Sequence, residues 1–76
     1  MPVTLADLKP GDRALIESID TNDPAVQRLM VLGLVESAEL EFLRKSLGGD
    51  PLEFRLFGTA ISLRREQARR FSVRLV

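Results

Sequence analysis

The segment that organises this chain is Gln27-Arg28-Leu29-Met30-Val31-Leu32-Gly33-Leu34. Its apolar residues recur at helical spacing, and Gly33 follows them where a helix usually ends in the left-handed conformation. Just upstream, Asp23 can cap a helix and Pro24 suits its first position, where a missing N–H is no loss. These signals predict one short helix over residues 24–32. Because a helix this short does not persist alone, we expect it to pack on a sheet.

Strand patterns lie on both sides of the predicted helix. Apolar and polar residues alternate, and turn signals at Pro10–Asp12, Leu47–Pro51 and Gly58 separate the alternating segments. Five short strands are predicted over residues 12–20, 35–45, 52–57, 60–63 and 71–75, with helical turns at 4–7 and 64–68. Short strands joined by tight turns are typical of a small antiparallel barrel. The prediction is therefore a mainly β fold, a five-stranded barrel with the helix over one mouth.

The length of the chain indicates a single small domain, over residues 1–76. Eleven basic residues balance eleven acidic ones, whereas domains that bind nucleic acid are usually basic. The N-terminus lacks the basic start and long apolar stretch of a secretory signal. No segment approaches the roughly 20 apolar residues of a membrane span. We expect a cytoplasmic protein that binds no nucleic acid, does not insert into the membrane and reaches it only through a partner.

The composition offers few groups for catalysis or metal binding. The chain has no His, Cys, Trp or Tyr, so its serines have no imidazole base to activate them. Ferrous iron prefers imidazole together with carboxylate ligands. Glu36, Glu39 and Glu41 lie close in sequence, but Glu39 and Glu41 are more simply the solvated side of a strand. We therefore expect no enzyme activity and no required cofactor, with weak binding of a divalent transition metal such as Fe²⁺ as the alternative.

Four motifs together resemble a known family. In chain order they are Leu5-x-x-Leu8-x-x-Gly11, Arg28-Leu29-x-x-Leu32-Gly33-Leu34, Gly49-Asp50-Pro51 and Leu63-Arg64-x-x-x-Ala68. Their order and spacing resemble FeoA, the small cytoplasmic ferrous iron transport protein A. The resemblance covers nearly the whole chain and implies an SH3-like barrel.

The resemblance also implies a role and a partner. FeoA proteins act beside FeoB, a large membrane permease that carries a GTP-hydrolysing G domain. The expected function is therefore to bind and modulate a FeoB-type permease, through its cytoplasmic part. The same small fold forms the C-terminal module of iron-dependent repressors, so a metal-sensing regulatory module is the first alternative. A small nucleic-acid-binding barrel is the second, and the oligomeric state stays open.

One position departs from the family pattern. The family usually has a glycine a few residues beyond Leu32-Gly33-Leu34, where this chain has Ser37. If the backbone there needs a positive φ, the serine is strained by about 1 kcal/mol. Any partner contact that the family makes at this turn is then in question for this chain.

Two groups of residues are candidates for binding the partner. Leu29 and Leu32 are expected in the core because of their helical spacing, whereas Met30, Leu34 and Val35 are the candidates for an exposed apolar patch. Arginines near the C-terminus form the second group, with Arg64, Arg65 and Arg69 as candidates for contact with acidic residues of a partner. The simpler interpretation of these arginines is a solvated face that pairs with Glu66 and nearby acids.

Overall fold

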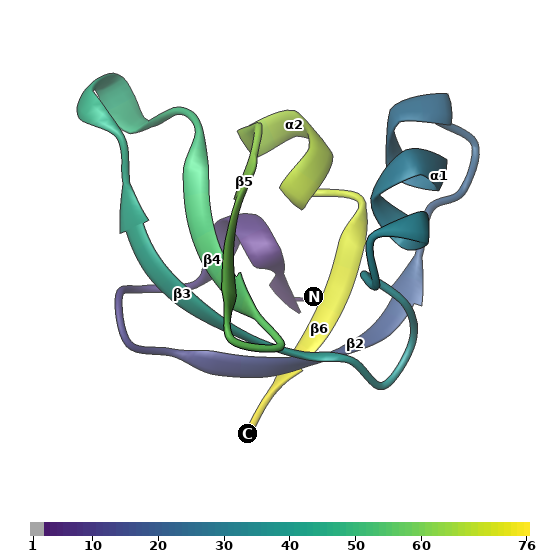
Figure 1. Ribbon diagram of the computed structural model, residues 1–76, viewed down its shortest axis with the longest axis horizontal. Helices are drawn as coiled ribbons and strands as arrows, with labels where there is room; N and C mark the ends of the chain where they lie inside the picture. Colours follow the sequence, from purple (N-terminus) through teal and green to yellow (C-terminus); the bar gives the residue numbers. More distant parts are fainter. Residues whose placement is uncertain (1–2) are drawn as a thin grey trace.

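The computed structural model is a strongly curled antiparallel sheet with short helices between its strands (Figure 1). It describes residues 3–76, so Met1 and Pro2 of the predicted domain lie outside the described residues. The strands are β1 (Val3–Thr4), β2 (Arg13–Ile19), β3 (Glu39–Lys45), β4 (Leu52–Leu56), β5 (Thr59–Leu63) and β6 (Phe71–Leu75). The helices are α1 (Pro24–Val31) and α2 (Arg65–Ala68), and the 3₁₀ turns are η1 (Leu5–Asp7) and η2 (Leu47–Gly49).

The five predicted strands are all present, and β1 is a sixth that the sequence did not suggest. The strand order is β1-β6-β2-β3-β4-β5, and all neighbours are antiparallel. The pairings of β2 with β6 and of β3 with β4 shift register after Ile16 and after Phe42. Such bulges bend a strand and increase its twist, which helps this sheet to curl into a barrel.

The strand predicted from residue 35 begins only at Glu39, because residues 35–38 form a turn. The Ala38 N–H donates to the Val35 carbonyl at 3.0 Å, and the Ser37 N–H donates to the Ile16 carbonyl on β2 at 2.8 Å. Ser37 has a φ of +73°. The position does require the left-handed conformation, and serine occupies it.

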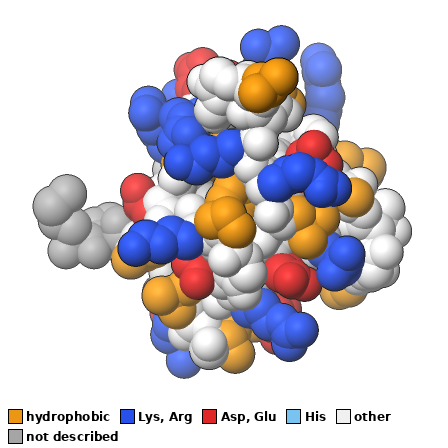
Figure 2. All heavy atoms as spheres, turned by 90° about the vertical axis from the view of Figure 1, so that its left-hand side faces the viewer, with side chains coloured by type: hydrophobic (Ala, Val, Ile, Leu, Met, Phe, Trp, Pro, Cys, Tyr) orange, Lys and Arg blue, Asp and Glu red, His pale blue; other side chains and the backbone are white. Residues whose placement is uncertain are grey.

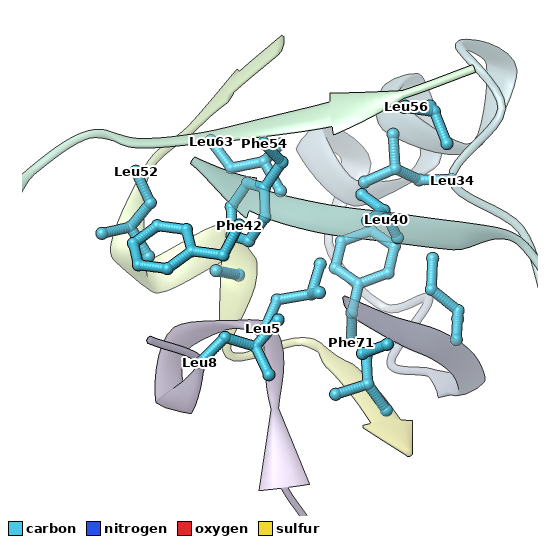
Figure 3. Packing of buried hydrophobic residues seen from close by; sticks show 14 of the residues in the cluster. Leu5, Leu8, Leu34, Leu40, Phe42, Leu52, Phe54, Leu56, Leu63 and Phe71 are labelled. Atoms are coloured by element: carbon cyan, nitrogen blue, oxygen red, sulfur yellow. The ribbon is translucent and has the colours of Figure 1, made fainter. Parts of the chain in front are cut away.

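The interior of the barrel is entirely apolar. Alternate residues of the strands point inward, so that Phe42, Phe54 and Phe71 lie in one cluster with the core leucines (Figure 3). The Phe42 and Phe54 ring centroids are 5.2 Å apart. Every buried side chain among residues 3–76 is hydrophobic. The polar and charged side chains of residues 3–76 therefore all lie at least partly exposed.

Two short helical elements, η1 and α2, pack against each other and contribute buried residues to the core. In η1 the Thr4 N–H donates to the Asp7 carboxylate at 2.9 Å, and the Thr4 hydroxyl accepts from the Ala6 N–H at 3.2 Å. This capping box turns Leu5 and Leu8 into the core, as predicted. The predicted turn at residues 64–68 is α2, which packs on η1.

Helix α1 begins and ends as the sequence indicates. The Asp23 carboxylate accepts from the Ala25 N–H at 2.9 Å, and Gly33 ends the helix with a φ of +116°. The Leu34 N–H donates to the Leu29 carbonyl at 3.3 Å, and the Gly33 N–H donates to the Met30 carbonyl at 3.0 Å. This pair of bonds is a Schellman motif, which reverses the chain and carries Leu34 inward.

The predicted burial of two leucines was wrong. Leu32, predicted in the core, is 62% exposed, and Leu34, a candidate for an exposed patch, is 0% exposed. Val26 marks the inner face of α1, and at about 100° per residue Leu32 lies about 120° away from it. The core position expected for Leu32 is taken by Leu34 after the reversal at Gly33.

Candidate functional site

Four large apolar side chains around the end of α1 are exposed. They are Val31 (86% exposed), Leu32 (62%), Val35 (41%) and Phe57 (76%). We call these four residues the apolar surface. Val31, Leu32 and Val35 flank Gly33 in the chain, and Phe57 reaches the same place from the turn between β4 and β5. Because the partly buried residues of α1 pack inward, the remaining apolar residues at its C-terminal end face solvent.

The position of Phe57 is set by close contact with Gly33. A Cβ atom at Gly33 would lie 3.0 Å from Phe57 Cε2, so the phenyl ring rests on the backbone at the end of α1. A Cβ atom there would be in tight contact with the ring, so glycine favours this close approach. The ring thus joins the β4–β5 turn to the α1 end in one surface, although the two segments are far apart in sequence.

Phe57 holds this position in an unfavourable backbone conformation. Phe57 and Gly58 form the two-residue turn between β4 and β5, with φ values of +51° and +79°. Turns of this kind favour Asn-Gly because both central residues need a positive φ. A bulky residue there costs roughly 1–2 kcal/mol, and its ring remains largely exposed. Core packing therefore does not account for phenylalanine at this position.

The predicted apolar patch agrees only in part with the residues that the structure exposes. Val35 is exposed as expected, Met30 is half-buried, and Leu34 is buried. Sequence reasoning missed Val31 and Phe57 and placed Leu32 in the core. If Val26 is taken as the inner face of the helix, the helical angle indicates that Val31 and Leu32 lie on the outer face. The dipeptide Phe57-Gly58 between two predicted strands signals a hairpin turn.

The three candidate arginines lie around α2 but differ in what they contact. Arg65 is half-buried, and its guanidinium donates to the Gly49 carbonyl at 3.0 Å while its N–H donates to Asp50 at 2.8 Å. These bonds connect α2 to the last residue of η2 and to the residue that follows it. Arg64 and Arg69 are exposed, and neither forms an ion pair with the part of the chain that the structure describes.

Ion pairs hold other arginines to the sheet. Arg70 Nη1 lies 2.8 Å from Asp20 Oδ2, and Arg74 Nε lies 3.5 Å from Glu17 Oε2. The expected pairing with Glu66 is not among the ion pairs of residues 3–76. Hydrogen bonds from the Asn22 N–H and from the Arg70 guanidinium hold the pKa of the Asp20 carboxyl below its usual value. Asp20 thus joins the end of β2 to the start of β6.

The acidic residues gather in no metal site over residues 3–76. Glu41 Oε1 accepts from Arg55 Nη1 at 3.2 Å, and Glu53 Oε1 lies 3.6 Å from Arg44 Nε. Basic and acidic side chains are interleaved over this side of the molecule (Figure 2). A shallow hollow lined by Asp50, Pro51 and Arg64 lies beside α2, and its carboxylate already accepts from the Arg65 N–H.

No helix within the described chain is long and apolar enough to cross a membrane. Most charged residues of the sheet form ion pairs with one another.

Comparison with known families gives one match over almost the entire chain. The model of the FeoA domain matches residues 3–75. A search of curated proteins finds no match.

Solved structures agree with the family match. The FeoA protein of Chlorobium tepidum has 41% sequence identity and a TM-score of 0.88, over 97% of this chain and 70% of that one. Stenotrophomonas maltophilia FeoA, described as a prokaryotic SH3 domain protein and solved with zinc, has 33% identity and a TM-score of 0.83, over 95% and 89% of the two chains. A manganese-dependent transcriptional repressor shares the fold at 18% identity, with a TM-score of 0.87 over 99% of this chain and 37% of that one.

Proposed function

The chain belongs to the FeoA domain family, which is linked to ferrous iron transport, and from that premise we propose that it binds a FeoB-type iron permease. In this proposal the cytoplasmic part of the permease is the partner, and the apolar surface is the contact. The chain is an accessory binding module that carries no iron and catalyses no reaction itself.

The observation that carries the proposal is the exposure of Phe57 at a strained turn. Single exposed apolar residues are ordinary on a protein surface. Here a phenyl ring is held at a φ of +51°, lies on Gly33 and adjoins three further exposed aliphatic side chains. Strained residues persist where the surrounding structure and the function require them, and a partner that covers the ring would supply such a requirement.

In the proposal, two exposed arginines form a second, polar contact with the partner, at the end of β5 that lies away from Phe57. Arg64 and Arg69 are free of ion pairs to described residues, so their guanidinium groups are available to carboxylates of a partner. Exposed charges that face a partner chiefly set association rate and orientation. In the proposal the apolar surface supplies the affinity, and the arginines orient the module.

The module would act by preferring one state of its partner. A bound protein shifts a conformational equilibrium only by the difference between its affinities for the two states. The proposed effect is therefore a change in the populations of the permease's cytoplasmic states or of its assembly. A measurable consequence is a change in its GTP hydrolysis when the module binds.

The test uses the full-length permease in lipid nanodiscs, titrated with this chain and with two variants, Leu32→Asp and Phe57→Asp. Each variant should weaken binding at least tenfold, because a carboxylate would lose its water in the contact. Leu47→Asp is the matched control, since Leu47 is also an exposed apolar residue but lies in η2. A complex that forms equally well with all three variants would refute the apolar surface as the contact.

Two parallel titrations separate this proposal from the alternatives. Ferrous iron added under anaerobic conditions should give no stoichiometric binding at micromolar concentration, whereas a metal-sensing module requires it. Random-sequence RNA at low and high salt should show no strongly salt-dependent binding, which a nucleic-acid-binding barrel requires.

A further inference from the structure

The second edge of the sheet is open, and we propose that β5 pairs there with β5 of a second copy of this chain. The two edge strands are β1 and β5. β1 has only two residues, which is a common way to blunt an edge. β5 has five residues, Thr59–Leu63, and pairs on one side only, with β4.

The register of β4 and β5 identifies the free backbone groups. Leu56 and Thr59 close the two-residue turn, so they exchange backbone hydrogen bonds, and the bonded pairs then alternate along the hairpin. Ala60 and Ser62 fall between bonded pairs, so their N–H and C=O groups point away from β4. The edge ends at Arg64, whose N–H already donates to Gln67 Oε1 at 3.0 Å.

The sequence of β5 does nothing to prevent another strand from pairing. Natural edge strands are usually protected by lysine, proline, a bulge or an inward-pointing charge. Thr59-Ala60-Ile61-Ser62-Leu63 contains no charged residue and no proline, and its pairing with β4 has no register shift. Ala60 and Ser62 are exposed, and their small side chains leave the edge accessible.

A second copy suits this edge because the strand is complementary to itself. If two β5 strands pair antiparallel about a twofold axis at Ile61, Ala60 of each chain faces Ser62 of the other. Each such pair exchanges both backbone hydrogen bonds. Ile61, which is partly buried against the core, faces its own copy and gains apolar contact on the inner side.

The charges on the outer face support the same pairing. Arg55 lies beside Ala60 and Glu53 lies beside Ser62 in the β4–β5 register. The twofold pairing therefore places Arg55 of one chain and Glu53 of the other in the same cross-strand row, with only Ala60 and Ser62 between them. No like charges meet across the edge. A contact of one short strand is smaller than a standard interface, so the dimer is weak and concentration-dependent.

The first test measures self-association of the full chain by sedimentation from about 10 μM to about 1 mM. The dimer fraction should rise over this range. Ser62→Pro removes one outward donor from each chain and should lower the association constant at least tenfold, whereas Ser62→Ala should leave it unchanged. If Ser62→Pro does not fold, the double variant Ala60→Lys and Ser62→Lys places ammonium groups opposite each other and should give the same loss.

The second test fixes the register. Because the chain has no cysteine, each introduced thiol is unique. Chains with Ala60→Cys mixed with chains with Ser62→Cys should cross-link under mild oxidation severalfold faster than either forms its own disulfide. Ser18→Cys is the control, since Ser18 is exposed on β2, which is not an edge strand of the sheet. A chain that stays monomeric at about 1 mM, or a dimer that tolerates both edge variants, would overturn the proposal.

Discussion

Ser37 holds a backbone angle that glycine normally occupies. Its φ of +73° brings its own N–H to the Ile16 carbonyl and starts the approach to β3. The left-handed conformation costs a residue with a Cβ roughly 1–2 kcal/mol, and glycine avoids that cost but loses more chain entropy on folding. The departure from the family pattern thus leaves a serine in a strained backbone conformation at this turn.

Ser37→Gly should therefore stabilise the chain by about 0.5–1 kcal/mol. The free energy of unfolding in urea measures this. Glu36→Gly is the matched control, since Glu36 is also exposed in the turn and has no positive φ, and it should destabilise slightly. Equal effects of the two substitutions would contradict the strain at Ser37.

Leu34 and Leu32 differ in burial although only Gly33 separates them. Leu34→Ala should cost about 2–4 kcal/mol, because it leaves a cavity in the core. Leu32→Ala should cost less than about 0.5 kcal/mol, because the side chain is mostly in water. Thermal unfolding of the two variants measures the difference. Comparable losses would mean that Leu32 contributes to the core after all.

At the scale of elements, Asp20 and Arg70 join β2 to β6 across the sheet. Asp20 directly follows Ile19, the last residue of β2. The Asp20 N–H donates to the Arg70 carbonyl at 2.8 Å, and the two side chains form an ion pair. The carboxylate also accepts from the Asn22 N–H at 3.2 Å. The loop before α1 is thereby held against the start of β6.

This linkage predicts a pH dependence. The pKa of Asp20 lies below its ordinary value of 3.8 in the folded chain, so its ionised form favours folding. That contribution is complete above the ordinary pKa and is lost as the pH falls through the lower, folded-state pKa. Asp20→Asn should therefore flatten the loss of stability between about pH 5 and about pH 2.

Denaturation curves at several pH values measure this effect. Arg70→Gln removes the Arg70 guanidinium contribution and leaves the Asn22 hydrogen bond to Asp20, so its pH profile should fall between those of the parent and Asp20→Asn. Three parallel profiles would show that Asp20 makes no such contribution.

At the scale of the whole molecule, the proposal predicts that Phe57 lowers the stability of the chain and strengthens its binding to the partner. Phe57→Asn places the residue that this turn favours before Gly58 and should raise the free energy of unfolding by about 0.5–1 kcal/mol. The same change removes the phenyl ring from the apolar surface and should weaken permease binding. Thermal unfolding and titration of the same sample measure both. A variant in which stability and permease binding both rise, or both fall, would contradict the role proposed for Phe57.

Sequence reasoning was most accurate where local chemistry decides structure. Asp23, Pro24 and Gly33 marked both ends of α1, and the alternation of residues 52–56 located the inward residues of β4. It failed where contacts between distant segments decide. β1 is too short to carry a pattern and exists because Val3 and Thr4 pair with Val73 and Ser72 on β6.

The order of motifs by itself determined the family and the barrel, because caps, turn glycines and strand alternation act over a few residues. Only the tertiary structure decided which apolar residues remain in water. The reversal at Gly33 gives Leu34 the core position expected of Leu32, and the ring of Phe57 reaches the end of α1 from another hairpin. Burial depends on what packs against a side chain, and for these residues that partner lies far away in the sequence.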